Sequence, residues 1–424
     1  MAPETVLIIG SGGREHALAW KLAQSRHVSK IIAVPGNPGI AKIADCVAID
    51  LANHAALIQL ARDTHVSLTM VGPEQPLVQG IVDRFRTERL PIVGPTAIAA
   101  RLEGSKAFAR EFMERHQIPS PRFGTFTDCV CARKFLAELD RPVVVKADGL
   151  AAGKGVLVCN AIEEAIQAID ECLVGQRFGA AGQKIVIEER LYGTELSLMV
   201  LSDGNDVVPL ASAMDHKRVG DGDAGPNTGG MGALSQAPGV TPALERKLLE
   251  TVILPTIDGM RRDGCPFTGI LYAGLMMVDG EPRVLEFNTR LGDPETQPIM
   301  VRLQSDLYNL LLASTNGTLA GVTVEWRSDV ATTVVLAAHG YPGKIHMGDA
   351  IIGVEQAERI EGVTVFHAGT AVRDGQLVTA GGRVLGVAAL GCDLHQSRQR
   401  AYQAVEKISF AGMHYRRDIG VKTI

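Results

Sequence analysis

A lysine on a short apolar strand, and a second lysine in the glycine-rich turn that follows, are well placed to handle phosphate groups. Residues 141–159 read as strand, turn and strand, with Lys146 on the first strand and Gly153, Lys154 and Gly155 in the turn. This is not a Walker loop, because the glycine spacing is one residue short, no serine or threonine follows the lysine, and a strand replaces the helix. Such a turn can cover a polyphosphate while Lys146 neutralises charge beneath it.

A glutamate and an asparagine two residues apart could hold a metal ion. Residues 283–288 read as a strand, whose two-residue period places Glu286 and Asn288 on one face and Phe287 on the other. Adjacent carboxylate and amide oxygens suit Mg²⁺ or Mn²⁺, which take further ligands from water and phosphate. Such a pair often occurs without a metal, so its interpretation depends on its company with the lysines.

Residues 215–233 hold six glycines interleaved with charged residues. This composition disfavours a core helix or strand and predicts a loop. The loop is either an idle linker or a backbone shaped to approach a ligand closely. Its charged residues favour the ligand site, because linkers are usually rich in serine, glycine or proline.

A further segment, residues 185–200, reads as two strands joined by a short polar break. The break exposes backbone donors and acceptors that could hold an adenine ring by its edge, and Glu195 could accept a hydrogen bond from a ribose hydroxyl. Taken alone, glutamates such as Glu188 and Glu195 are more often solvated.

The elements of residues 1–103 predict an edge at which ligands could bind. Apolar runs alternate with helical stretches and predict βαβ winding, the runs being Val6–Ile9, Lys30–Val34, Ser67–Val71 and Pro91–Val93. Each run ends in a glycine turn, and in a parallel sheet these turns share one edge. The first turn is not a dinucleotide fingerprint, because Glu15 stands at the third glycine position and no carboxylate closes the second strand, which disfavours a nicotinamide cofactor. It could bind one phosphate beside Arg14, or it could be a tight turn without a ligand.

Composition narrows the class of protein. The chain of 424 residues is long enough for about two to four domains, and its 46% hydrophobic content supplies their cores. The net charge of −5 and the absence of lysine or arginine runs disfavour a nucleic-acid or anionic-lipid partner. Seven scattered cysteines, and no secretory or membrane-length segment, predict a reduced, cytoplasmic protein with no membrane partner.

The order of these motifs resembles that of the ATP-grasp fold, from Gly104-Ser105-Lys106 before a helix to the Glu286-x-Asn288 strand. Essentially the whole chain resembles the glycinamide ribonucleotide synthetase family, and residues 215–233 are the most specific part of that likeness. The resemblance implies an ATP-dependent ligase that joins glycine to 5-phosphoribosylamine through a glycyl phosphate, yielding glycinamide ribonucleotide, ADP and phosphate. This would be the second step of de novo purine (IMP) biosynthesis.

The resemblance also implies roles for individual residues. Arg290, Lys146 and Asp215 would be catalytic, Arg290 by steadying the transferring phosphoryl group. Glu286 and Asn288 would hold Mg²⁺ or Mn²⁺. ATP would contact Lys106, Lys146, Gly153, Lys154, Gly155, Glu188, Glu189, Leu191 and Glu195. Glycine and the ribosylamine would contact Gly12, Gly13, Arg14, Asn37, Glu74, Asp215, Lys217, Arg218 and Arg290. His216 is interpreted as a structural histidine in preference to a proton carrier.

The expected architecture is α/β with three domains. A doubly wound parallel sheet spans residues 1–103, an ATP-grasp domain spans 104–328 with a lid at about 122–190, and a small strand-rich cap spans 329–424. No carboxylate stands on the strand that precedes Glu286, so Asp293, Glu295 or water would have to supply any further metal ligand. A monomer is expected.

Three alternatives remain open from the sequence. A carboxylase that makes carboxyphosphate would share the lysines and the Glu286-x-Asn288 pair. A nucleotide-binding regulatory module without turnover would share the first sheet. An oxidoreductase would need the third glycine that the chain lacks.

Overall fold

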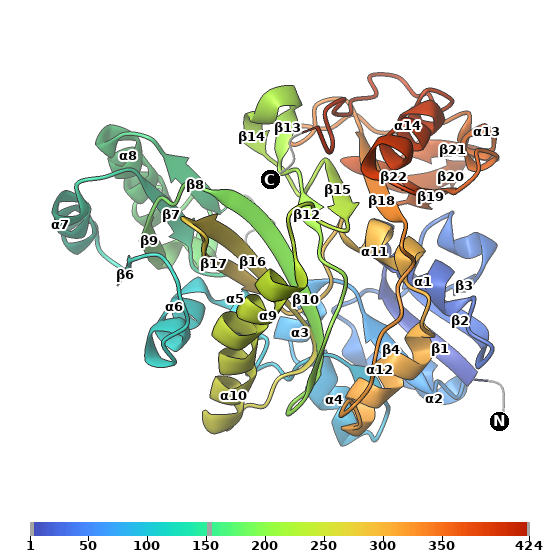
Figure 1. Ribbon diagram of the computed structural model, residues 1–424, viewed down its shortest axis with the longest axis horizontal. Helices are drawn as coiled ribbons and strands as arrows, with labels where there is room; N and C mark the ends of the chain where they lie inside the picture. The colour runs from blue at the N-terminus through green and yellow to red at the C-terminus, as the bar shows by residue number, and fades with distance from the viewer. Residues whose placement is uncertain (1–3, 151–154, 422–424) are drawn as a thin grey trace.

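The computed structural model describes residues 4–150 and 155–421 of the chain (Figure 1). Its amino-terminal part is a parallel five-stranded sheet of order β3-β2-β1-β4-β5, as predicted. Val6–Ile9 are fully buried, which is typical of a parallel strand covered on both faces. The strands are β1 Glu4–Gly10, β2 Val28–Pro35, β3 Asp45–Cys46, β4 Leu68–Val71 and β5 Ile92–Val93. The helices are α1 Gly13–Leu22, η1 Ile40–Lys42, α2 His54–Asp63, α3 Glu74–Val78, α4 Ile81–Thr87 and α5 Arg101–Gly104.

A second sheet, of order β6-β9-β7-β8, projects from the molecule at the left of Figure 1. It has a hydrophobic cluster of its own, in which Leu136 and Ile169 from the helices pack with Val145 and Ile187 from the strands. The helix α6, Lys106–Arg115, connects it to the first sheet. The elements are β6 Phe123–Phe126, α7 Cys129–Leu139, β7 Val143–Ala147, β8 Val156–Cys159, α8 Ile162–Leu173, η2 Gly179–Gln183 and β9 Ile185–Glu189.

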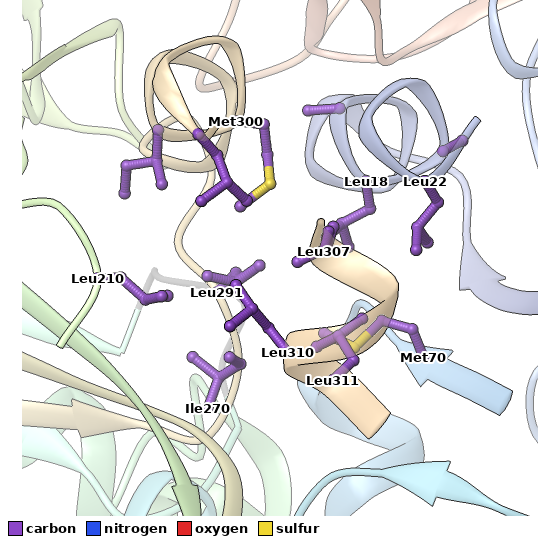
Figure 2. Packing of buried hydrophobic residues seen from close by; sticks show 14 of the residues in the cluster. Leu18, Leu22, Met70, Leu210, Ile270, Leu291, Met300, Leu307, Leu310 and Leu311 are labelled. Carbon is purple, nitrogen blue, oxygen red and sulfur yellow. The ribbon is translucent and has the colours of Figure 1, made fainter. Parts of the chain in front are cut away.

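The central sheet is antiparallel, of order β11-β10-β16-β17, and carries the predicted metal strand at its edge. Two of the helices that follow it pack against the amino-terminal part, so that side chains of α1, β4, β16, α11 and α12 share one core (Figure 2). The strands are β10 Thr194–Asp203, β11 Val207–Pro209, β16 Thr268–Val278 and β17 Glu281–Asn288. The helices are α9 Pro242–Leu248, η4 Leu249–Ile253, α10 Leu254–Arg262, α11 Thr296–Arg302 and α12 Leu307–Asn316.

The register of β17 shifts by one residue just before the predicted metal pair. Glu286 pairs with Gly274 but Val284 pairs with Leu275, so Leu285 has no partner on β16. Strict alternation would place Val284 and Phe287 on opposite faces, yet both belong to one buried cluster. The extra residue therefore changes the phase of the strand, and Glu286 follows directly after it.

The carboxyl-terminal part is built on a sheet of order β12-β15-β18-β22-β19. Its first two strands come from residues 214–235, which precede β16 and β17 in the chain. The elements are β12 Met214–Asp215, β15 Gly232–Ser235, β18 Val330–Ala337, α13 Val354–Glu358, β19 Val363–His367, β20 Thr370–Arg373, β21 Gln376–Thr379, β22 Arg383–Gly391 and α14 Leu394–Val405.

The prediction that residues 215–233 form a loop was wrong. Between β12 and β15 the chain forms an antiparallel hairpin of β13 Arg218–Gly220 and β14 Ala224–Asn227, joined through η3 Asp221–Asp223. Gly222 and Gly225, at φ of 67° and 80°, supply the left-handed turns. The composition argues only against strands in a core, whereas β14 is exposed along its whole length and needs no apolar side chains.

No helix in the described ranges is long and apolar enough to cross a membrane. All seven cysteines are free.

Candidate active site

An open cavity of about 210 Å³ lies where the projecting sheet, the central sheet and the 215–233 segment meet. It gathers predicted residues that are far apart in the sequence: Glu74, Lys106, Lys146, Gly155, Glu188, Asp215, Lys217, Glu286, Asn288 and Arg290. Apolar side chains line another part of its wall, among them Leu102, Ala109, Met113 and Val156. A cavity with an apolar wall and several converging charges is typical of a site for a polar ligand that also carries a flat apolar group.

Lys106 is held at the start of α6. Ser105 is the N-cap of this helix, and its Oγ accepts a hydrogen bond of 3.2 Å from the Phe108 amide. Asp148, at the end of β7, accepts bonds from the Ser105 hydroxyl at 3.0 Å and the Ala107 amide at 3.1 Å. The Lys106 ammonium donates to the Gly149 carbonyl at 2.9 Å. The start of the helix and the end of the strand are thereby joined at the rim of the cavity.

Lys146 belongs to a buried charge cluster with Arg110 and Glu188. The Glu188 carboxylate accepts two bonds of 2.7 Å from Arg110 and lies 2.8 Å from the Lys146 ammonium. Burial by itself would raise the pKa of Glu188, but these two cations hold it below its ordinary value. Burial lowers the pKa of Lys146, and Glu188 opposes that effect. The cluster leaves Lys146 as a desolvated cation beneath the cavity.

The same two cations meet the carbonyl of the extra residue in β17. The Leu285 carbonyl accepts a hydrogen bond of 2.9 Å from Lys146 and one of 2.7 Å from Arg110. The register shift would otherwise leave this partly buried carbonyl without a strand partner. Arg110 also donates to the Val284 carbonyl at 2.8 Å, so one guanidinium satisfies both carbonyls that flank the shift.

Glu286 faces the cavity, where solvent reaches its side chain. Removal from bulk water would raise its pKa, but the charges of Lys217, Lys146 and Lys106 hold the pKa of Glu286 below its ordinary value. An ionised carboxylate beside the Asn288 amide is the oxygen donor set that a hard divalent cation prefers. Among the described residues no group of three or more histidine, cysteine, aspartate or glutamate side chains could hold a metal, so a cation bound here would also need ligands from water or substrate.

Arg290 is held by two carboxylates. Its Nε lies 3.1 Å from Glu74 and its Nη2 lies 2.9 Å from Glu103, while Nη2 also donates to Asn288 Oδ1 at 3.2 Å. Burial would lower the pKa of Arg290, but Glu103 and Glu74 raise it above its ordinary value. The guanidinium therefore stays charged and adjoins the predicted metal ligand Asn288.

Asp215 and Lys217 line the cavity beside the buried side chains of Glu295 and Tyr272. The Lys217 ammonium lies 3.2 Å from Asp215 Oδ2, whereas Asp215 Oδ1 is buried and has no hydrogen-bond partner within residues 4–150 and 155–421. Burial raises the pKa of Asp215 to about 7, and the nearby Glu295 adds to the effect. Tyr272 donates to Glu295 at 2.6 Å and its hydroxyl lies 2.8 Å from the Ser197 hydroxyl. This wall of the cavity is therefore able to gain or lose a proton near neutral pH.

The carboxyl-terminal part holds the 215–233 segment against this wall. Gly229 lines the cavity, its amide donates to the Tyr341 hydroxyl at 3.0 Å, and its carbonyl accepts from Arg383. Arg383 also donates to the carbonyl of Asp293 and lies 3.7 Å from its carboxylate. Tyr341 and Arg383 do not line the cavity themselves, but they hold Gly229, which does.

Family models match almost the whole chain. The descriptions are "Phosphoribosylglycinamide synthetase" N domain at residues 4–103, ATP-grasp (A) domain at 104–296 and C domain at 331–422. The chain belongs to the phosphoribosylglycinamide synthetase family. It is therefore a ligase of the ATP-grasp type that uses ATP, as the motifs predicted.

Relatives of this synthetase agree over its full length. A phosphoribosylamine–glycine ligase of Vibrio parahaemolyticus is 53% identical over 423 residues, which cover 99% of this chain and 98% of that protein. The crystal structure of the phosphoribosylamine–glycine ligase of Thermotoga maritima superposes with a TM-score of 0.86 at 36% identity, covering 98% of this chain and 100% of that one.

A biotin carboxylase from Campylobacter jejuni shares the fold, with a TM-score of 0.74 at 16% identity, covering 97% of this chain and 93% of that one. The fold alone would therefore not have separated the synthetase from a carboxylase.

Several predicted residues do not line the cavity. Asn37 is saturated, because its amide donates to the Ser11 and His367 carbonyls and its Oδ1 accepts from the Gly39 and Ile40 amides. Glu15 accepts bonds from the Gly12 amide and the Arg14 side chain, and Arg14 also donates to the Leu291 carbonyl. A Cβ on Gly13 would lie 2.5 Å from Gln297 Nε2, so this turn packs closely against α11.

The other predicted residues that the structure describes do not line the cavity either. Glu189 pairs with Arg141 and accepts from the Arg122 amide, and Arg218 donates to the Gly225 carbonyl within the hairpin. Leu191 lies between β9 and β10, and Glu195 lies on β10, where its charge adds to those of Tyr272 and Asp215 in raising the pKa of Lys217. His216 accepts from the Gly420 amide at 3.1 Å, away from the cavity lining. Gly153 and Lys154 lie outside the described residues.

Sequence reasoning missed four residues that shape the site: Glu103, Arg110, Tyr272 and Arg383. Glu103 stands directly before the Gly104-Ser105-Lys106 motif, and Arg110 falls on the buried face of α6 together with Ala107 and Met113. A charged residue on an apolar helix face was the available signal for Arg110. Tyr272 and Arg383 carry no such local signal.

Proposed function

We propose that this synthetase ligates glycine to 5-phospho-D-ribosylamine with ATP, giving glycinamide ribonucleotide, ADP and phosphate through a glycyl phosphate. This is the second step of de novo purine (IMP) biosynthesis. The observation that supports the proposal best is that the 215–233 segment, with Asp215, Lys217 and Gly229, lines the same cavity as Lys106, Lys146 and Glu286. The cavity thus has a nucleotide end, with Lys106, Lys146 and Glu286, and an acceptor end, with Asp215, Lys217 and Gly229.

The chemistry requires activation of a poor acyl donor. A free carboxylate does not react with an amine, so a glycine oxygen attacks the γ-phosphorus of ATP and the bond to ADP breaks. The ribosylamine nitrogen then attacks the acyl carbon, the bond from that carbon to the phosphate oxygen breaks, and phosphate leaves. The enzyme contributes position and charge neutralisation more than covalent chemistry.

Named side chains meet these requirements. Lys106 and Lys146 neutralise the ATP phosphates, and Arg290 steadies the transferring phosphoryl group and then the acyl phosphate. Lys217 receives the glycine carboxylate. Asp215, whose pKa is about 7, takes part in removing the proton that the amine loses. Glu74, on the amino-terminal side of the cavity, is assigned to the ribosylamine.

A divalent cation fits the donor set of the site. Glu286 is ionised and Asn288 offers an amide oxygen, and both line the cavity beside the lysines. These two residues would hold Mg²⁺ or Mn²⁺, which when bound shields the phosphate charge.

The proposal includes the division of the chain at residues 1–103, 104–328 and 329–424, with the β6-β9-β7-β8 sheet acting as a lid at about 122–190. Its strand β7 carries Lys146, so movement of this sheet would carry that lysine toward the phosphates. One chain supplies all the side chains that the proposal uses, so a monomer suffices.

The test supplies the purified protein with ATP, Mg²⁺, glycine and freshly generated phosphoribosylamine, and follows ADP and the ligated product. We expect ADP to form only when all substrates are present, in equal amount with product. ADP formed without glycine, or with bicarbonate in place of glycine, would reject the ligase and favour a carboxylase.

The acyl phosphate has a separate test. Glycine labelled with ¹⁸O in its carboxylate should transfer one labelled oxygen to the released phosphate. Unlabelled phosphate from an otherwise complete reaction would exclude the glycyl phosphate while leaving the ligase activity intact.

A further inference from the structure

Glu103 lies behind Arg290 and contacts two consecutive residues at the end of β17. Its Oε1 is 2.9 Å from Arg290 Nη2, and its Oε2 accepts from the Thr289 amide at 2.7 Å and the Thr289 hydroxyl at 3.0 Å. Its side chain is only 7% exposed. One carboxylate therefore holds both the guanidinium and the backbone that carries it.

The second carboxylate on Arg290 differs in kind. Glu74 comes from α3 of the amino-terminal part, and its side chain is 29% exposed within the cavity. Both carboxylates line the cavity, but the side chain of Glu103 is much the less exposed of the two, so a ligand can replace the Glu74 contact more readily than the Glu103 contact. The two contacts to the same guanidinium should therefore have different effects on catalysis.

We propose that Glu103 is the positioning residue for Arg290, which it holds facing the transferring phosphoryl group through its joint contacts with the guanidinium and Thr289. This inference rests on the proposed function, because it assigns the orientation of Arg290 in that reaction. Glu103 does not touch the reacting atoms. It acts only through Arg290 and the end of β17.

A double-mutant cycle tests the dependence on Arg290. Glu103→Gln keeps the size of the side chain and an oxygen for Thr289, but removes the charge that orients the guanidinium. The four proteins are the wild type, Glu103→Gln, Arg290→Ala and the double variant, each assayed for product with enzyme in excess over substrate. Glu281→Gln, an acid-to-amide change in an exposed pair with Lys247, is the matched control.

We expect Glu103→Gln to lower the rate of product formation about 10- to 100-fold, as a misplaced catalytic group does. In the Arg290→Ala background the same change should cost less than about twofold, because the group that Glu103 orients is gone. Nucleotide affinity, measured by calorimetric titration with ADP and Mg²⁺, should differ by less than about twofold between the wild type and Glu103→Gln.

An equal loss in both backgrounds, or a loss of nucleotide affinity as large as the loss of rate, would overturn the inference. Thermal unfolding of each variant distinguishes a misfolded protein from one in which only the arginine is misplaced. A properly folded Glu103→Gln variant with the wild-type rate would also overturn the inference. If the wild type forms ADP without glycine, the proposed function fails instead. The cycle then still reports on Arg290 through that ADP formation.

Discussion

The ammonium of Lys146 lies 2.8 Å from Oε2 of Glu188, and neither side chain is more than 8% exposed. Arg110 occupies the other side of the same carboxylate at 2.7 Å. One acid thus balances two buried cations, both of which also bond the Leu285 carbonyl next to Glu286. The cation beneath the proposed phosphate site and the backbone that presents the proposed metal ligand are held by the same cluster.

Removal of the Glu188 charge should destabilise the fold strongly. Glu188→Gln leaves Arg110 and Lys146 buried without a full counter-charge, and we expect a loss of about 3–5 kcal/mol in the free energy of unfolding. Urea denaturation measures the loss. Glu281→Gln, in an exposed pair, should cost less than about 1 kcal/mol. Similar losses in the two variants would show that the buried cluster does not stabilise the protein.

Asp215 should impose a pH dependence on stability. Its folded pKa is about 7 because of burial, whereas in an unfolded chain the pKa of aspartate is about 3.9. Between these values the folded protein keeps a proton that the unfolded chain has released, so the free energy of unfolding falls as pH rises through the window and levels off above it. Asp215→Asn should remove this fall. The check is denaturation of both proteins across the window, and parallel curves would refute the assignment.

Glu286→Ala should abolish turnover by weakening the binding of the divalent cation. We expect the rate to fall by about 100-fold or more, with part of the activity returning as Mg²⁺ is raised, because several kcal/mol of charge stabilisation depend on the ion. Steady-state rates against Mg²⁺ concentration provide the measurement. Glu281→Ala, on the exposed start of the same strand, is the control. Undiminished activity in Glu286→Ala would remove this residue from the site.

Tyr341→Phe should affect the acceptor end alone. The change removes the hydroxyl that accepts from the Gly229 amide, and one such bond is worth about 0.5–1.5 kcal/mol, or up to about tenfold. We expect the KM for glycine to rise by that factor while the KM for ATP stays constant. Tyr402→Phe, which loses a bond to the Arg416 carbonyl instead, should change neither. A rise in the KM for ATP would contradict the division of the cavity into two ends.

Gly269→Ala should report the contact between the first and central sheets. Gly269 has a φ of +93°, and a Cβ there would lie 2.7 Å from the Gly94 Cα. Gly280 has a similar φ of +80° with open space around it, so Gly280→Ala carries the backbone strain without the clash. We expect Gly269→Ala to be about 1–3 kcal/mol less stable than Gly280→Ala in denaturant unfolding. Equal stabilities would mean that the two sheets separate easily here.

Local pattern was enough for the elements and for several functional side chains. The apolar run Val6–Ile9 predicted a strand of a parallel sheet, and it is fully buried in that sheet. The glycine turn that follows a lysine-bearing strand, and the Glu286-x-Asn288 period, placed Lys146 and Glu286 correctly on β7 and β17. Hydrophobic periodicity acts over a few residues, so a sequence states it directly.

The 215–233 segment shows where that reasoning stops. Its composition argued against strands, but a lack of apolar side chains rules out only buried strands. An exposed hairpin, or a short strand at a sheet edge, needs few apolar side chains. Gly232 is required because a Cβ there would lie 2.6 Å from the Thr333 carbonyl of β18, a strand about a hundred residues later in the chain. Only the folded chain reveals that neighbour.

The amino-acid sequence by itself determined the α/β architecture, the family and the residue types that the reaction needs. The tertiary structure decided which charges meet: Arg110 with Glu188 across 78 residues, and Arg290 with Glu74 across 216. Such pairings leave no periodic signal in the sequence, because which charges pair depends on their distance and burial in the folded protein. These long-range contacts bring the separate motifs together around one cavity.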